Sequence, residues 1–241
     1  MAYHLIGHPL GHSCSPALHR LLGNPDYGLL DLPEDEVEAF ILAKGYDGLN
    51  VTIPYKQQVM QYLDEISPEA KAIGAVNVVR CQRSTVNCQP KLTGYNSDVI
   101  GFVESIKPLL KPHHEKALIL GTGGASKAIH YGLEEKLGME TLFVSRTSRE
   151  NMITYNDITK DLLQDYTVIV NCSPVGMFPK VDECPALPYE AMNENHLLYD
   201  LVYNPLETLF MKKGAAQGAT VKNGLEMLHL QAIASWEFWT Q

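Results

Sequence analysis

The chain of 241 residues lacks any apolar run long enough to cross a membrane, which would take about 18 or more consecutive apolar residues. Its first residues, MAYHLIGHPLGHS, also lack the basic stretch followed by an apolar stretch that marks an export signal. We therefore expect a cytoplasmic protein with neither a membrane span nor a secretory leader.

Basic residues are scarce, because 19 lysines and arginines stand against 28 aspartates and glutamates, a formal net charge of -9. Binding to a nucleic-acid backbone draws on an excess of positive charge, so this balance argues against a nucleic-acid partner. The five cysteines are odd in number and include no CxxC pair, which predicts free thiols in a reducing compartment. The histidines form no HExxH motif and no Cys/His series, so no metal site is expected.

What the chain does contain is a glycine-rich turn at its centre, within the segment 116–149. A short apolar run leads into small residues, which are followed by a helical pattern and a second apolar run; the small residues include Gly121, Gly123, Gly124 and Ala125. This order predicts a βαβ unit whose first turn lets a pyrophosphate approach backbone N–H groups at a helix N-terminus. Ser126 occupies the third position of the usual fingerprint. An ordinary strand-to-helix turn is the alternative interpretation.

The residues after the second apolar run indicate which cofactor is bound. An NAD-binding unit usually carries an acidic residue about 20 residues after the glycines, where it binds the ribose 2′-hydroxyl. That place here holds guanidinium and hydroxyl groups, on Ser145, Arg146, Thr147 and Arg149. Arginine forks match phosphate geometry and no carboxylate repels the charge, so the pattern predicts the 2′-phosphate of NADP. A solvated basic turn is the alternative.

Strand-like and helix-like segments alternate along the rest of the chain, which predicts an α/β protein with mainly parallel sheets. A strand at 48–53 ends before Pro54 and is expected to put Lys56 at the start of the next helix. That is the carboxyl end of a strand, where ligands of open α/β sheets bind. Asp98 is expected to cap the following helix, and a hairpin excursion is expected at 82–91.

Three further polar residues stand out before the central unit. Ser13 and Ser15 precede Pro16, so Ser15 either caps a helix whose first residue is Pro16, or both hydroxyls bind a polyol or carboxylate ligand. Asn77 lies in a strand-like segment at 74–81. A buried amide needs partners, which a ligand hydroxyl or a neighbouring loop would supply.

Taken together, nine segments resemble the shikimate dehydrogenase family. In chain order they are GHPLGHSCSP, NVTIPYK, GAVN, GYNSD, GTGGAS, SRT, NCSPVGM, DLVYNP and GLEMLHLQA. The resemblance spans almost the whole chain and implies two α/β domains with a cleft between them. Residues 1–97 and 222–241 would form the substrate-binding domain, and residues 98–221 the Rossmann-like NADP-binding domain.

The resemblance also implies an activity, the NADP-dependent reversible reduction of 3-dehydroshikimate to shikimate in aromatic amino-acid (chorismate) biosynthesis, by a monomer or homodimer. Lys56 would transfer the proton, with Asp98 as its partner in the catalytic pair. The implied substrate ligands are Ser13, Ser15, Thr52, Asn77, Tyr203 and Gln231. The implied NADP contacts are Gly121, Gly123, Gly124, Ala125, Ser145, Arg146, Thr147 and Arg149, with Gly224 and Met227 near the nicotinamide.

Three related functions would show different residues. A quinate/shikimate dehydrogenase tends to use NAD, and an acid would then stand in place of Arg146. A catalytically silent shikimate-binding sensor should have lost Lys56 or Asp98, and both are present. A folate-type dehydrogenase of the same layout fits the Ser-x-Ser-Pro segment less well. The chain departs from the family in carrying Ser145 where asparagine is usual and in a short stretch at 147–165.

Overall fold

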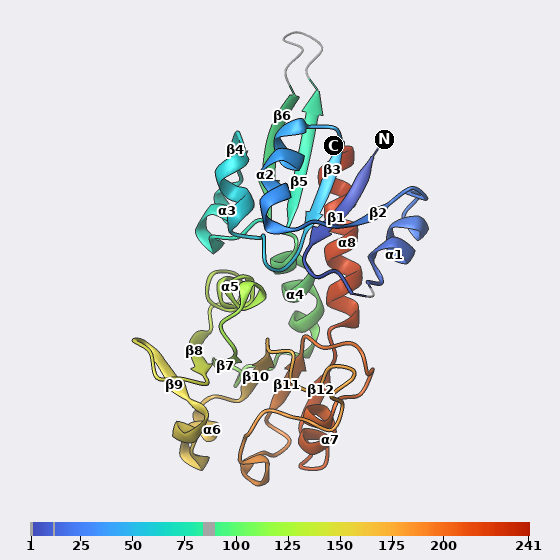
Figure 1. Cartoon of the computed structure of the whole chain (residues 1–241). Helices are drawn as coiled ribbons and strands as arrows, with labels where there is room; N and C mark the ends of the chain where they lie inside the picture. The colour runs from blue at the N-terminus through green and yellow to red at the C-terminus, as the bar shows by residue number, and fades with distance from the viewer. Residues whose placement is uncertain (1, 12, 84–89) are drawn as a thin grey trace. The chain divides into compact units, whose positions relative to one another are not determined.

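The computed structural model describes residues 2–11, 13–83 and 90–241, which form two compact units (Figure 1). The first unit comprises Met1–Gly101 and His229–Gln241, and the second comprises Phe102–Leu228. Each is built of strands and helices, in agreement with the predicted α/β class.

The division between the units falls inside two helices. These are α4 (Asp98–Ile106), which is divided after Gly101, and α8 (Leu225–Thr240), which is divided after Leu228. The predicted domain boundaries, after 97 and before 222, lie a few residues away from these points. The assignment of substrate to one unit and of NADP to the other remains a prediction.

The first unit is built on a mixed six-stranded sheet in the order β2-β1-β3-β5-β6-β4. Strand β1 runs parallel to β2 and β3, and β4 runs parallel to β6, whereas β5 is antiparallel to both of its neighbours. The strands are β1 (Tyr3–Gly7), β2 (Gly28–Asp31), β3 (Gly48–Val51), β4 (Glu65–Ile66), β5 (Val78–Arg83) and β6 (Pro90–Tyr95). Of the hairpin excursion predicted at 82–91, Gln82, Arg83, Pro90 and Lys91 belong to the paired strands β5 and β6, and residues 84–89 lie outside the described part of the chain.

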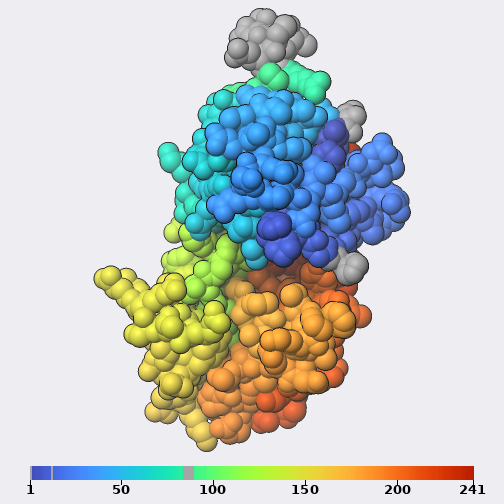
Figure 2. Space-filling view, in the orientation of Figure 1, coloured from blue at the N-terminus to red at the C-terminus, as the bar shows by residue number. Residues whose placement is uncertain are grey.

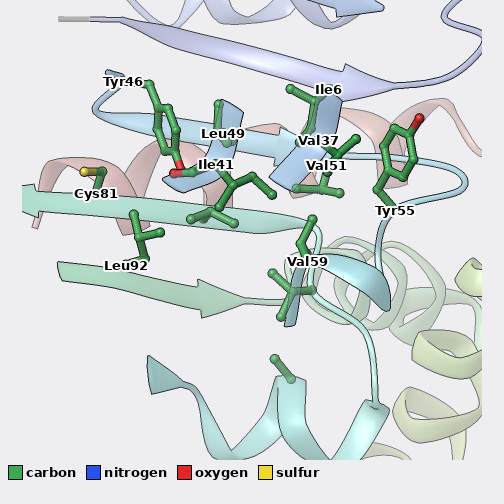
Figure 3. Packing of buried hydrophobic residues seen from close by; sticks show 13 residues of the cluster. Ile6, Val37, Ile41, Tyr46, Leu49, Val51, Tyr55, Val59, Cys81 and Leu92 are labelled. Atoms are coloured by element: carbon green, nitrogen blue, oxygen red, sulfur yellow. The ribbon is translucent and has the colours of Figure 1, made fainter. Parts of the chain in front are cut away.

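Apolar side chains cover both faces of this sheet. Figure 3 shows one face, where Val37 and Ile41 pack over the strands with Val59. The covering elements there are α2 (Glu34–Ala43), the 3-10 helix η1 (Gln58–Tyr62) and α3 (Pro68–Ile73). On the other face Trp239 of α8 stacks on Tyr3 at 4.8 Å between ring centroids. Helix α1 (Ser15–Leu21) follows β1 and carries the buried His19.

The second unit contains a parallel sheet in the order β12-β11-β10-β7-β8-β9. Counted along the chain from β7, this is the doubly wound order 3-2-1-4-5-6 of dinucleotide-binding sheets, read from the other edge. The strands are β7 (Lys116–Leu120), β8 (Glu140–Ser145), β9 (Met152–Thr154), β10 (Val168–Asn171), β11 (Leu197–Asp200) and β12 (Thr220–Lys222). The order reverses between β7 and β10, so the carboxyl ends of these two strands define the point where a ligand of such a sheet binds.

Helices cover both faces of the second sheet as well. Ile129 of α5 (Gly124–Tyr131) and Leu133 of the following helical turn η3 (Gly132–Lys136) pack on one face with the ends of α4 and α8 that belong to this unit. The other face is covered by α6 (Lys160–Asp165) and α7 (Leu209–Ala215), through Leu163 and Phe210. The short 3-10 helices of this unit are η2 (Lys107–Leu109), η4 (Tyr155–Asp157) and η5 (Tyr189–Ala191). The central βαβ unit predicted from the glycine-rich turn is confirmed by β7, α5 and β8.

Several predicted boundaries were wrong. The strand predicted at 74–81 begins only at Val78, because Gly74 adopts a left-handed conformation with φ 70° and ends α3. Lys56 does not open a helix but lies in the turn before η1. Helix α1 begins at Ser15 and its capping residue is Cys14, which makes no side-chain capping bond, so Ser15 is not the cap.

Candidate active site

The side chain of Lys56 lies in the first unit, beyond the carboxyl end of β3. The turn that carries it is anchored by Tyr55, whose buried ring directs its hydroxyl to the carbonyl oxygen of Leu32. The carbonyl of Lys56 itself accepts a hydrogen bond from the N–H of Val76 at 2.8 Å. The backbone around Lys56 is therefore held from both sides, which limits the positions its ammonium group can reach.

Lys56 and Asp98 meet as a close ion pair. The Nζ of Lys56 lies 2.6 Å from Oδ2 of Asp98, and the two side chains are 13% and 10% exposed. An ion pair so far removed from water is screened much less than one on the surface. These two residues come from segments 42 positions apart in the chain. Lys56 and Asp98, which were predicted to act as a pair, are thus in contact within the first unit.

Asp98 does not cap its own helix, as its sequence position had suggested. It is the first residue of α4, and Oδ1 of Asn96 accepts hydrogen bonds from the N–H groups of Asp98 at 3.1 Å and Val99 at 3.4 Å. Asn96 is therefore the capping side chain. A capping carboxylate would be occupied by backbone N–H groups, whereas the carboxylate of Asp98 is left free to bind side-chain partners.

Asn77 is the second side-chain partner of Asp98. Its Nδ2 donates to Oδ1 of Asp98 at 2.9 Å and to Oγ of Ser97 at 3.0 Å, and its Oδ1 accepts from the N–H of Ser97 at 2.7 Å. Asn77 is 3% exposed, so these bonds satisfy a buried amide, as the sequence had required. The two carboxylate oxygens of Asp98 are thus shared between an ammonium group and an amide.

The other predicted substrate ligands are distributed over both units. Gln231, on α8, has its Oε1 3.4 Å from Oγ of Ser97 and so lies beside the group around Asp98. Ser13 and Ser15 lie at the start of α1, where Oγ of Ser13 accepts from the N–H of Ser15, and the half-buried Thr52 follows β3. Tyr203 belongs to the second unit, in the loop after β11.

The glycine-rich turn of the second unit lies at the switch point of its sheet. Gly121 has φ +105°, a conformation that favours glycine, and it packs close to the backbone of Ser173 in the loop after β10. Gly123 is the N-cap of α5, and Oγ of Ser126 donates to its carbonyl at 2.7 Å. The serine in the third fingerprint position thus braces the turn, and the backbone N–H groups at the start of α5 remain suited to a pyrophosphate.

The basic turn after β8 is exposed, whereas the residue before it is buried. Ser145 is 6% exposed, and its Oγ accepts from the N–H of Thr147 at 3.3 Å. Arg146 and Arg149 are exposed on this turn, and Figure 2 shows the segment around residue 150 standing out from the surface of the second unit. The turn carries two arginines and begins at a buried, hydrogen-bonded residue, so it fits a phosphate ligand.

Two residues predicted near the nicotinamide have clear structural roles. Gly224 lies directly against the carbonyl oxygen of Leu201, where a Cβ atom would collide with backbone. Met227 is 7% exposed and packs in the core cluster of the second unit. These contacts explain why the chain carries a glycine and an apolar side chain there, and the predicted cofactor contacts stay predictions.

A buried carboxyl that was not singled out from the sequence, that of Asp200, links the carboxyl ends of β10 and β11 to the segment that follows β11. Asp200 accepts hydrogen bonds from Nδ2 of Asn171 at 2.9 Å, the N–H of Val202 at 3.0 Å and Oγ1 of Thr208 at 2.6 Å. Burial raises the pKa of Asp200 to about 6, although these bonds oppose the shift. The polar residues that end two neighbouring apolar strands were the available signal.

Within the described ranges no helix is long and apolar enough to span a membrane. In the same part of the chain, no three or more His, Cys, Asp or Glu side chains gather in a group that could hold a metal ion. The described cysteines, Cys14, Cys81, Cys172 and Cys184, are free, and Cys88 lies outside the described residues.

Comparison with known proteins gives a consistent result. Residues 5–79 match the model of the shikimate dehydrogenase substrate binding domain. An NADP(+) shikimate dehydrogenase of Desulforamulus reducens is 33% identical, over 98% of this chain and 88% of its own length. One of Bacillus cereus is 35% identical, over 99% of this chain and 92% of its own. The structure of a Thermus thermophilus shikimate 5-dehydrogenase in complex with NADP(H) and shikimate superposes with a TM-score of 0.84 at 32% identity, covering 100% of this chain and 93% of that one.

Proposed function

The chain belongs to the shikimate dehydrogenase family, and we propose that Lys56 and Asp98 are the catalytic pair of its activity. The activity is the NADP-dependent, reversible reduction of 3-dehydroshikimate to shikimate. The observation that carries the residue assignment is the 2.6 Å contact between the ammonium of Lys56 and the carboxylate of Asp98 in a largely buried setting. A protein that only bound the ligand would have no use for a proton-transfer pair.

The reaction requires one proton-transfer group among the protein's own side chains. When shikimate is oxidised, a hydride goes to the nicotinamide and the proton of the reacting hydroxyl must leave, and the reverse reaction needs a proton donor at the same oxygen. We assign that proton transfer to Lys56. Asp98 holds the ammonium through Oδ2, and Asn77 holds Asp98 through Oδ1, so the direction of the lysine side chain is set before substrate binds.

We propose that NADP is held by the second unit. The glycine-rich turn after β7 and the N-terminus of α5 would bind the pyrophosphate, through Gly121, Gly123, Gly124 and Ala125. Arg146, with Thr147 and Arg149, would hold the 2′-phosphate, and Ser145 would shape this turn through its bond to the N–H of Thr147. The doubly wound strand order of this unit supports the assignment.

We likewise propose that the first unit holds shikimate or 3-dehydroshikimate. The match of residues 5–79 to a substrate-binding domain supports this, since that segment lies wholly within the first unit. Its hydroxyl and amide side chains suit a polyhydroxy acid. The substrate ligands in this unit would be Ser13, Ser15, Thr52, Asn77 and Gln231. Tyr203, the remaining predicted substrate ligand, belongs to the second unit.

Replacing Lys56 by alanine tests the proposal. Because the group that transfers the proton is lost, we expect turnover of shikimate with NADP to fall by about 100-fold or more, with substrate affinity changing less. Turnover is followed by absorbance of the reduced nicotinamide, and affinity by equilibrium titration of shikimate.

Lys91→Ala is the matched control, because Lys91 also forms an ion pair in the first unit, with Glu65, but at the surface. This variant should keep the turnover of the unmodified enzyme. Near-normal turnover of Lys56→Ala would remove Lys56 from the mechanism while leaving the family assignment intact.

A further inference from the structure

The hydrogen bonds of Asn77 continue into a buried network that ends on the C-terminal helix. Oγ of Ser97, which accepts from Asn77, lies 3.0 Å from Oγ of Ser235 on α8. Oγ of Ser235 also accepts a hydrogen bond from Nδ2 of Asn50 at 2.9 Å, and Oδ1 of Asn50 accepts one from the hydroxyl of Tyr27 at 2.8 Å. All five residues are 6% exposed or less, so water does not compete for these bonds.

Each hydroxyl in this network has a single hydrogen atom, which fixes the direction of each hydrogen bond. The hydroxyl of Ser235 donates to the carbonyl of Gln231 at 2.8 Å, one turn earlier in the same helix, so its oxygen is left to accept. The single hydroxyl hydrogen of Ser97 then points to Ser235, the nearest acceptor open to it at 3.0 Å. The oxygen of Ser97 is consequently an acceptor for the amide of Asn77.

This direction fixes which end of the Asn77 amide faces Asp98. The N–H of Ser97 holds Oδ1 of Asn77, and the hydroxyl oxygen of Ser97 holds one hydrogen of its Nδ2. The other Nδ2 hydrogen is directed to Oδ1 of Asp98. If Ser235 could not accept, the hydroxyl of Ser97 would turn to another acceptor, and Oδ1 of Asn77 and Oε1 of Gln231 each lie 3.4 Å away.

We propose that Ser235 is a positioning residue for the Lys56–Asp98 pair, acting through Ser97 and Asn77, with Asn50 and Tyr27 holding Ser235 from behind. The proposal rests on the proposed function, because it takes Lys56 and Asp98 to be the catalytic pair. Ser235 reaches neither of them directly. It sets the direction of the Ser97 hydroxyl, which is two hydrogen bonds away from the carboxylate of Asp98. In this way it keeps that carboxylate in the position where it binds Lys56.

The decisive variant is Ser235→Ala. It removes one oxygen and leaves the hydroxyl of Ser97 and the amide of Asn50 each short of a partner. We expect kcat for shikimate oxidation with NADP to fall about 10-fold, because small displacements of a catalytic group are costly in rate. KM should change much less. Ser235→Thr, which keeps the hydroxyl, should recover most of the lost kcat.

Ser105→Ala is the control for the loss of a buried hydroxyl. Ser105 lies on α4 with 1% exposure and shares a 2.6 Å hydrogen bond with Tyr199, away from the network. Its removal should lower the melting temperature without lowering kcat. Unchanged kcat in Ser235→Ala, an equal fall of kcat in Ser105→Ala, or no recovery in Ser235→Thr would each overturn the proposal.

Two further measurements keep the test decisive. If Ser235→Ala does not yield folded protein, Tyr27→Phe removes only the hydroxyl that holds Asn50, and it should lower kcat less but measurably, so that an unchanged kcat would again overturn the proposal. Lys56→Ala is measured in parallel. Full turnover in Lys56→Ala would refute the catalytic pair itself, whereas a collapse there with normal kcat in Ser235→Ala would refute only the role of Ser235.

Discussion

Arg146 is the single residue from which a change of cofactor preference is expected. It is exposed at the start of the turn after β8, and no acidic residue occupies the turn from Ser145 to Arg149. Replacing it by alanine should raise KM for NADP by about 10- to 100-fold, because a hydrogen bond to a charged group contributes about 1.5–3 kcal/mol. KM for NAD should change little, since NAD has no 2′-phosphate. Initial rates with each cofactor measure both values.

Arg83 provides the comparison for this prediction, because it is an exposed arginine at the end of β5 in the other unit. Its replacement by alanine should leave KM for both cofactors unchanged. If the KM values of Arg146→Ala for NADP and NAD rose by the same factor, the role of Arg146 would be to stabilise the turn. It would then not bind the 2′-phosphate.

The sequence predicted individual side chains best where their chemistry was unusual for their position. Lys56, at a predicted helix start, and Asn77, on an apolar background, were both singled out, and the structure brings both into contact with Asp98. Ser235 was not found, because a small serine in an amphipathic helix gives no signal until the facing strand is known. Asn96 was missed because the neighbouring Asp98 is an equally good capping residue.

Gly48 shows how one element depends on the space left by another. A Cβ atom there would lie 2.5 Å from Nε1 of Trp239, whose ring nitrogen donates to the carbonyl of Val79 at 3.0 Å. Gly48→Ala would push this ring away from the sheet and loosen α8, so we expect a loss of about 1–3 kcal/mol in the free energy of unfolding. Urea denaturation followed by tryptophan fluorescence measures it.

Gly45, three residues earlier, is the natural control. It is exposed, and a Cβ atom added to it would have nothing within 4 Å. Gly45→Ala should therefore stay within about 0.5 kcal/mol of the unmodified protein. Equal destabilisation by the two substitutions would show that the ring of Trp239 is not what requires glycine at position 48.

Long, patterned elements were predicted from the sequence and short ones were not. Strand β7 precedes the glycine-rich turn, and helix α5 and strand β8 follow it, as predicted, because apolar runs and glycines define these elements locally. Strands β9 and β12 have three residues each and no alternating pattern of their own. They form because each pairs with the free edge of a neighbouring strand. That pairing depends on the rest of the sheet and cannot be read from the three residues themselves.

Two buried groups, one in each unit, should act on stability in acid in opposite directions. Burial lowers the pKa of His19, in the first unit, to about 4, whereas burial raises the pKa of Asp200, in the second, to about 6. Between pH 6.5 and 4 an unfolded His19 binds more protons than the folded one, so stability falls as the pH is lowered, by up to about 3 kcal/mol. Between pH 3.8 and 6 the folded Asp200 binds more protons, so the second unit gains stability as the pH is lowered.

Burial also lowers the pKa of His114 in the second unit, but less far than that of His19, so we expect acid to open the first unit first. Hydrogen exchange of backbone amides between pH 6.5 and 4 should show β1 and β3 losing protection while β10 and β11 keep theirs. His19→Phe, which keeps an aromatic ring on Tyr27, should reduce the acid sensitivity of the first unit. Part of it should remain, because the pKa of His4 is also lowered by burial. Earlier exposure of β10 and β11, or no change on replacing His19, would contradict the expectation.

The order in which this chain leaves the ribosome differs from the order in which its units can be completed. The sheet of the first unit is made from early residues, yet Trp239, which covers Gly48 and bonds to Val79, arrives only with the last helix. The later-synthesised second unit has all of its residues before the earlier one does, because residues 229–241 belong to the first. During synthesis, the nascent first unit therefore lacks the aromatic side chains that α8 brings to one face of its sheet, and that face can close only when the rest of the chain has emerged.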